Sequence, residues 1–122
     1  MIINNHLEQT KNHVKRVEDI FNEIDEKRET KTCDAMKGIV REGEEMMKEF
    51  SNSSAIDAAL ISAAQKVEHY EMATYGTLRA YAEQLKIDGV ADKLQLTLDE
   101  EGEANSLLTS LATNGINEGA WA

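Results

Sequence analysis

The chain has 122 residues, with 13 basic and 23 acidic side chains and a formal net charge of −10. Its length fits one small domain. The acidity argues against nucleic-acid partners, whose phosphates are bound largely by Lys and Arg, and against docking on anionic membranes. A single cysteine, Cys33, excludes an internal disulfide, and the first residues do not resemble a signal peptide, so we expect a cytoplasmic protein.

The chain has no proline and is rich in Ala, Leu, Glu, Lys and Met, which favours helix nearly throughout. The first predicted helix covers about Ile3 to Glu26. Its amphipathic stripe recurs at spacings of three and four: Leu7, Thr10, Val14, Val17, Phe21 and Ile24. The charged segment 25–32 lacks apolar anchors, so we expect a loop there.

Three further helices are predicted after that loop. The second covers about Cys33 to Phe50 and is capped by Thr32 or Asp34. After a break at 51–54, the third covers about Ala55 to Leu85. A tight turn at 86–89 leads into the fourth, from about Gly89 to Thr113. The apolar positions of the second and fourth helices are Met36, Ile39, Val40, Met46, Met47, Leu94, Leu98, Leu108 and Leu111.

The short turn makes the third and fourth helices an antiparallel hairpin, and the short second helix serves as a crossover from the first. The sequence therefore predicts an all-α antiparallel helix bundle of three long helices plus one short connecting helix, over residues 1–113. A flexible C-terminal tail at 114–122 follows. Bundles usually close with four long helices, so we expect the fourth to be missing from the N-terminal side or to come from a partner chain.

Carboxylates interrupt the apolar patterns of the last two predicted helices. Glu68 and Glu71 are three residues apart among Ala, Leu and Val, so both lean to one side of the third helix, and Glu101 interrupts the stripe of the fourth. A buried carboxylate needs a proton or a cation. We take all three as candidate metal ligands. The alternative is that Glu68 or Glu71 lies at a boundary, paired with Lys66 or Arg79.

The first predicted helix offers an imidazole, His13, which lies seven residues after His6 on the same face. We take His13 as a fourth candidate ligand; the alternative is a polar residue at the edge of the bundle. Carboxylates with an imidazole in a helix bundle suit paired iron or manganese ions. His69 lies about 100° around the helix from Glu68 and is expected at the surface or behind the metal ligands, not among them.

Four segments resemble the ferritin-like bacterial stress proteins of the YciE/YciF type. They are "HLEQTKNHVKRVEDIF", "CDAMKGIVREGEEMM", "DAALISAAQKVEHYEMATYGTLRAYAEQL" and "TLDEEGEANSLLTSLA", and the resemblance spans His6 to Ala112. It implies a ferritin-like four-helix bundle, often dimeric, that is linked to stress responses and has a di-metal-type carboxylate site. Glu68 and Glu71 match the carboxylates of that family's third helix, and Glu101 matches the carboxylate of its last helix.

The chain departs from the family pattern in three places. A preceding helix with an Ala-Glu-x-Gln segment is absent, Gln9 stands where relatives commonly have Glu, and Asn105 stands where they commonly have Asp. Each change removes negative charge, which implies a site that is weakened, mononuclear or lost. The absent helix would expose apolar faces, so we expect a homodimer or a higher homo-oligomer.

Two hypotheses follow. The first is a ferritin-like, stress-associated protein whose core site, made of Glu68, Glu71, Glu101 and His13, binds iron or manganese. No catalytic residue is assigned and the question of enzymatic activity stays open. The alternative is a metal-free structural or interaction module that acts through homo-oligomerisation. Metal analysis discriminates between the two.

Overall fold

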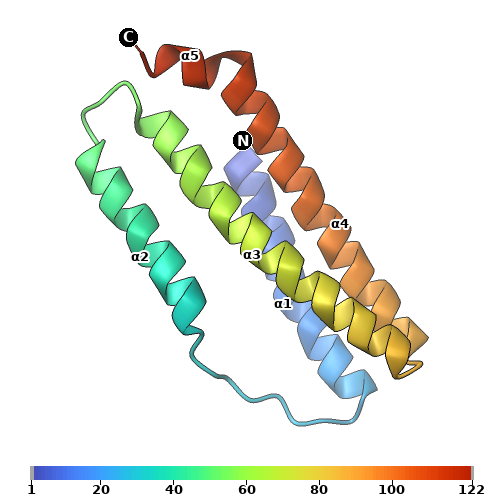
Figure 1. Ribbon diagram of the computed structural model, residues 1–122. Coiled ribbons are helices and arrows are strands. Elements are labelled where there is room, and N and C mark those ends of the chain that lie inside the picture. Colours follow the sequence, from blue (N-terminus) through green and yellow to red (C-terminus); the bar gives the residue numbers. More distant parts are fainter. Residues whose placement is uncertain (1, 122) are drawn as a thin grey trace. The chain divides into compact units, whose positions relative to one another are not determined.

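The computed structural model describes residues 2–121, so the two ends of the predicted domain and tail, residues 1 and 122, lie outside the described residues. Figure 1 traces the helices in chain order by colour. They are α1 (Ile2–Glu23), α2 (Asp34–Glu49), α3 (Ile56–Gln84), α4 (Asp88–Leu111), the π-helical η1 (Ala112–Ile116) and the short α5 (Asn117–Gly119). The described chain contains no strand, and the predicted all-α class is confirmed.

Two helices end in the same way, with one residue in the left-handed region. Asp25 follows α1 with a φ of 57°, and Lys86 follows α3 with a φ of 58°. The next N–H then bonds back five residues, from Glu26 to the Phe21 carbonyl and from Ile87 to the Ala82 carbonyl, both at 3.0 Å. This Schellman geometry satisfies carbonyls that the helix leaves open. It ends α1 three residues before the predicted boundary.

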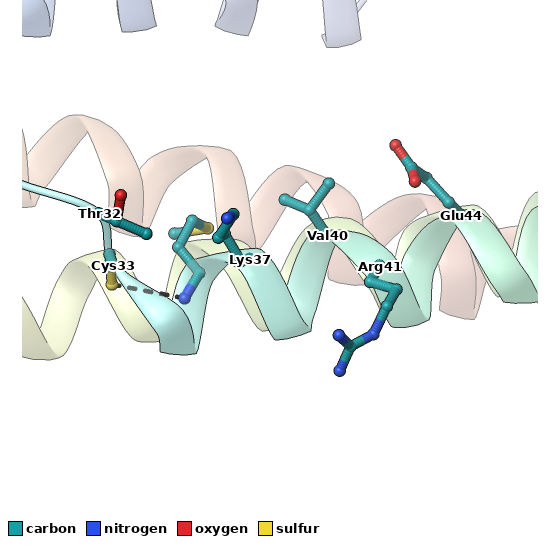
Figure 2. A pocket seen from close by; sticks show the side chains of 7 residues that line it. Thr32, Cys33, Lys37, Val40, Arg41 and Glu44 are labelled. Carbon is teal, nitrogen blue, oxygen red and sulfur yellow. Dashed lines mark hydrogen bonds between the residues drawn. The ribbon is translucent and has the colours of Figure 1, made fainter.

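The start of α2 differs from the prediction, because Cys33 is the N-cap and not Thr32 or Asp34. Cys33 has an extended backbone, and its Sγ accepts a hydrogen bond from the Met36 N–H at 3.4 Å (Figure 2). The same sulfur lies 3.0 Å from the Tyr70 hydroxyl oxygen. These two hydrogen bonds lower the pKa of the Cys33 thiol, with that from Tyr70 contributing most. A thiol therefore fills the position that usually belongs to Ser, Thr, Asp or Asn.

The chain divides into two compact units, each made of segments distant in sequence. The first unit comprises Met1–Lys31 and Glu71–Ala104, and the second comprises Thr32–Tyr70 and Asn105–Ala122. The core of the first unit is a cluster of small and branched apolar residues from α1, α3 and α4. Its buried members are Ile20, Ala82, Val90, Ala91 and Leu94, and Ile24, Tyr75 and Ile87 pack against them.

Helix α1 buries a different side from the one its apolar pattern marks. Leu7 and Val14 are 51% and 54% exposed, whereas His13 is only 3% exposed and Ile20 is buried. At 3.6 residues per turn, the two sides lie about a quarter turn apart. The side with the histidines thus faces the interior of the first unit, and an apolar stripe is left at its surface.

In the second unit, Ala59, Ile61 and Leu108 are buried. Gln65 of α3 donates from its amide to Thr109 Oγ1 at 2.8 Å and to the Asn105 carbonyl at 3.3 Å. These bonds tie α3 to α4 within this unit. Among the described helices, none combines the length and the apolar character needed to span a membrane.

Candidate metal site

The first unit contains a carboxylate that is fully removed from solvent. Glu101 of α4 is 0% exposed, and it shares a helix face with the buried residues Thr97 and Ala104, four positions before it and three after. The periodicity that buries these neighbours also buries Glu101. A carboxylate at this depth must have a compensating partner, because an isolated buried charge costs several kcal/mol.

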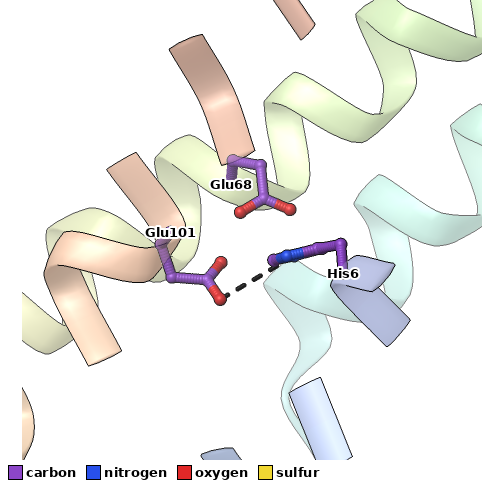
Figure 3. A group of neighbouring side chains, drawn as sticks. All are labelled: His6, Glu68 and Glu101. Carbon is purple, nitrogen blue, oxygen red and sulfur yellow. Dashed lines mark ion pairs between the residues drawn. The ribbon is translucent and has the colours of Figure 1, made fainter. Parts of the chain in front are cut away.

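Two histidines of α1 lie beside this carboxylate. His13 Nδ1 lies 2.9 Å from Glu101 Oε1, and His6 Nε2 lies 3.8 Å from the same oxygen. The spacing of seven residues puts both imidazoles on one side of α1, with ring centroids 6.4 Å apart. Figure 3 shows His6 and Glu101 with this ion pair as a dashed line, and it also draws Glu68 of α3. Two imidazoles therefore converge on one buried oxygen.

The next contribution comes from α3. Burial raises the pKa of the Glu71 carboxyl to about 8, and both a hydrogen bond with Glu101 and the charge of Glu101 act in the same direction. Tyr75, one turn further on, has its pKa raised by burial and then by the charges of Glu71 and Glu101. Two neighbouring carboxylates repel each other when both are ionised. The pair of Glu71 and Glu101 therefore retains a proton or takes up a cation.

A chain of polar contacts links His13 to the surface of the first unit. Arg16 donates from Nη1 to Thr97 Oγ1 at 2.7 Å and to Glu100 Oε1 at 2.8 Å. Glu100 Oε1 lies 3.4 Å from His13 Nε2. Burial lowers the pKa of His13, Glu100 opposes this, and Arg16 adds to it. His13 is thus held between the carboxylates of two consecutive residues of α4.

The short distances around His13 do not give well-aligned hydrogen bonds. Neither ring nitrogen makes a hydrogen bond of acceptable geometry with another described residue. A neutral imidazole in this setting has a lone pair that is not committed to a donor. Nitrogen and carboxylate oxygen donors together suit Mn, Fe and Zn. The residues of the first unit therefore fit a divalent transition metal.

Three of the four predicted ligands come together in the first unit: Glu71, Glu101 and His13. The interpretation of His13 as a polar residue at the bundle edge is wrong, since this side chain is almost fully buried. Glu68 lies one turn before Glu71 on α3, in the second unit, and is 3% exposed. It is buried and not at a boundary, and its place in the site stays a prediction.

The remaining polar groups near these carboxylates on α3 have local partners. Arg79 pairs with Glu83 at 2.7 Å, and His69 is exposed, with its Nδ1 2.8 Å from the Gln65 carbonyl oxygen. The surface position predicted for His69 is confirmed.

Sequence reasoning did not select His6. The signal was present in the spacing of His6 and His13, which lie two turns apart on one helix face. The Glu100 contact with His13 had no comparable signal, because Glu100 belongs to an acidic run of the kind that usually faces solvent.

Comparison with known proteins gives consistent results. A family model described as "Domain of unknown function (DUF892)" matches residues 1–121. Protein YciF of Escherichia coli (strain K12) is 42% identical over 116 residues, which cover 94% of this chain and 70% of that protein.

Two solved structures are similar. The crystal structure of the E. coli stress protein YciF has a TM-score of 0.88 and 41% identity, over 95% of this chain and 74% of that one. YcfI of Rhodopseudomonas palustris has a TM-score of 0.85 and 37% identity, over 89% of this chain and 69% of that one. The resemblance to YciF-type proteins and the predicted ferritin-like helical class are confirmed.

Proposed function

This chain belongs to the family described as a domain of unknown function, DUF892, and on that premise we propose that it binds a divalent metal ion, iron or manganese. The ligands in the first unit would be Glu71, Glu101, His6 and His13. The observation that carries the proposal is the burial of His13 beside Glu101, with neither imidazole nitrogen in a well-formed hydrogen bond.

The electrostatics of the carboxyl pair support the proposal. Without a metal, the raised pKa of Glu71 means that this carboxyl holds a proton at neutral pH next to Glu101. A divalent cation would replace that proton and attract both carboxylates at once. Because Glu101 is fully buried and Glu71 is partly buried, the solvent weakens this attraction less than it would at the surface.

Gln9 has a role in this arrangement. Its side-chain Oε1 lies 3.1 Å from His6 Nδ1. An amide oxygen only accepts, so Nδ1 carries the hydrogen and Nε2, the atom nearer Glu101, is left with its lone pair. Such an outer hydrogen bond fixes the orientation of a metal-binding histidine. Gln9 would thus orient a ligand and would not bind the metal itself.

The proposal extends to Glu68 and to the cellular role. Glu68 lies one turn from Glu71 on the same helix and would be a further carboxylate ligand. E. coli YciF is described as a stress protein, and we propose a stress-associated role in the cytoplasm for this chain too. No reaction is assigned.

Metal analysis of protein purified without chelator tests this proposal. We expect iron, manganese or zinc to copurify. After the metal is stripped with a chelator, adding back the same ion should raise Tm, because a ligand that binds only the folded state stabilises it. If no metal copurifies and none of the three ions shifts Tm, the proposal fails. A reading of Tm with added Ca²⁺ controls for general cation effects.

A second candidate function, homo-oligomerisation through an exposed apolar face, has its own support. Ile3, Leu7 and Val14 form a stripe on α1, and each is more than half exposed. Adjacent exposed apolar residues commonly mark protein–protein contacts. A C2 dimer would bury the same stripe of both copies.

Light scattering at micromolar concentration tests the second candidate. We expect a dimer or higher oligomer that the Leu7→Lys variant dissociates, because a lysine would be desolvated in the interface. Leu96→Lys is the matched control, since Leu96 is 50% exposed on α4 of the same unit and lies off the stripe. A wild-type chain that stays monomeric, or equal effects of both variants, would contradict this function.

A further inference from the structure

A groove of about 250 Å³ lies beside the candidate metal site, within the first unit. Val14 and Val17 of α1 and the ring of Tyr75 of α3 form apolar walls. His13 and Glu71 also line the groove, and His13 is almost fully buried. The groove therefore joins an exposed apolar surface to the buried imidazole of His13 and the partly buried carboxyl of Glu71.

The solvent-exposed end of the groove carries one pair of opposite charges. Arg28 Nη1 donates to Glu18 Oε1, and both side chains are about half exposed. This pair neutralises itself and leaves no net charge at that end to select an ion. The chain as a whole carries −10, which disfavours anions.

The apolar walls of the groove disfavour a charge of either sign placed against them. A charged ligand body between Val14 and Val17 would lose its hydration without gaining a partner, which is costly. An apolar ligand has no such cost and gains contact with the two valines and with Tyr75.

The size of the groove limits the ligand to about one ring. An engineered apolar cavity of about 150 Å³ accommodates benzene. The present volume accepts a six-membered ring with one or two substituent atoms. At the inner end, the ring nitrogens of His13, which is almost fully buried, are not in well-formed hydrogen bonds with described residues. A hydroxyl on the ligand would satisfy one of them.

We propose that this groove binds a small uncharged molecule of single-ring size, with one hydrogen-bonding group directed to His13 and Glu71. The binding goes beyond metal uptake, because the walls and the polar end exist without a metal. Any effect of the bound molecule on the metal rests on the proposed function.

Phenol is a suitable probe, and chelator-treated protein keeps this test separate from the metal proposal. Titration would be followed by NMR of the methyl groups of Val14 and Val17 and of the Tyr75 ring. We expect shifts confined to the groove and a dissociation constant on the order of 1 mM, typical of a ligand with few heavy atoms. Benzoate has the same ring with a negative charge and should bind at least tenfold more weakly, because a further carboxylate beside Glu71 is disfavoured.

The Val14→Trp variant should weaken phenol binding at least tenfold by filling the groove. Val40→Trp is the matched control, because Val40 is 45% exposed on α2 and does not line the groove, and it should leave binding unchanged. If the circular dichroism of Val14→Trp shows a folding defect, Val17→Phe replaces it.

Three outcomes would overturn the inference: no shifts at 20 mM phenol, shifts outside the groove that neither groove variant reduces, or benzoate that binds as tightly as phenol. Because every sample is free of metal, the phenol result is independent of whether the protein binds iron or manganese.

Discussion

Replacing Glu101 with Gln is expected to abolish the rise in Tm that added Mn²⁺ or Fe²⁺ gives to the stripped wild-type protein. Glu101 is the fully buried carboxylate on which His6 and His13 converge, so its loss removes the central ligand. A metal at a hundredfold excess over its Kd stabilises a protein by about 2.7 kcal/mol, and this amount should disappear in the variant. Thermal unfolding with and without metal measures it.

The Glu101→Gln substitution should not destabilise the metal-free protein. Glutamine removes a buried acid from a pair that disfavours two charges, so the stability without metal should stay equal to wild type or increase. Glu103→Gln is the matched control, because Glu103 is an exposed residue two positions along α4. It should keep the full response to metal. A Glu101→Gln protein with an intact metal response would refute the assignment of Glu101 as a ligand.

The metal-free protein is expected to lose stability as the pH rises from about 4.5 to about 8, through the titration of Glu71. The folded protein holds this proton up to about pH 8, whereas the unfolded chain releases it near the ordinary value of 4.5. Between these values the folded state binds more protons, and stability therefore falls with increasing pH. The contribution is complete below pH 4.5, is lost above pH 8, and is on the order of a few kcal/mol.

Urea unfolding at pH 5 and pH 8 measures this effect as a difference between wild type and Glu71→Gln. The comparison with Glu71→Gln is needed because the titration of His13 changes the pH dependence of stability in the opposite direction. Its lowered pKa means that the unfolded chain binds the proton more readily, so that stability is lost as the pH falls below about 6.5. Glutamine at 71 does not titrate and should remove the Glu71 part of the slope.

Glu83→Gln is the control for the pH experiment, since Glu83 is an exposed carboxylate on the same helix. It should leave the slope between pH 5 and pH 8 unchanged. Equal slopes for wild type and Glu71→Gln would show that Glu71 ionises in the folded protein as it does in water. The buried carboxyl pair would then not exist in solution.

Metal binding and the pH effect are linked through the same carboxyl. A metal must displace the Glu71 proton, so the apparent affinity of metal should rise with pH up to about 8. Both experiments thus test the Glu71 carboxyl: the pH experiment follows its proton, and the metal experiment follows the cation that replaces this proton.

The sequence by itself determined the helices and the carboxylates. The absence of proline and the spacing of apolar residues predicted all four main helices within a few residues of their observed ends. The interruption of the α3 and α4 patterns by Glu68, Glu71 and Glu101 identified these side chains as buried or half-buried acids. These features are local: they depend on helical periodicity and on the chemistry of single residues.

Only the tertiary structure decided which side of α1 faces the interior of the first unit. The stripe containing Leu7 and Val14 is the more apolar, yet these residues stay exposed while His13 is buried. The physical reason lies on another helix, since Glu100 and Glu101 of α4 offer His13 its partners. Periodicity along one helix cannot reveal such a partner 87 or 88 positions away in the chain. The sequence selected His13 as a candidate ligand, but its burial and the inclusion of His6 depended on the packing of α1 against α4.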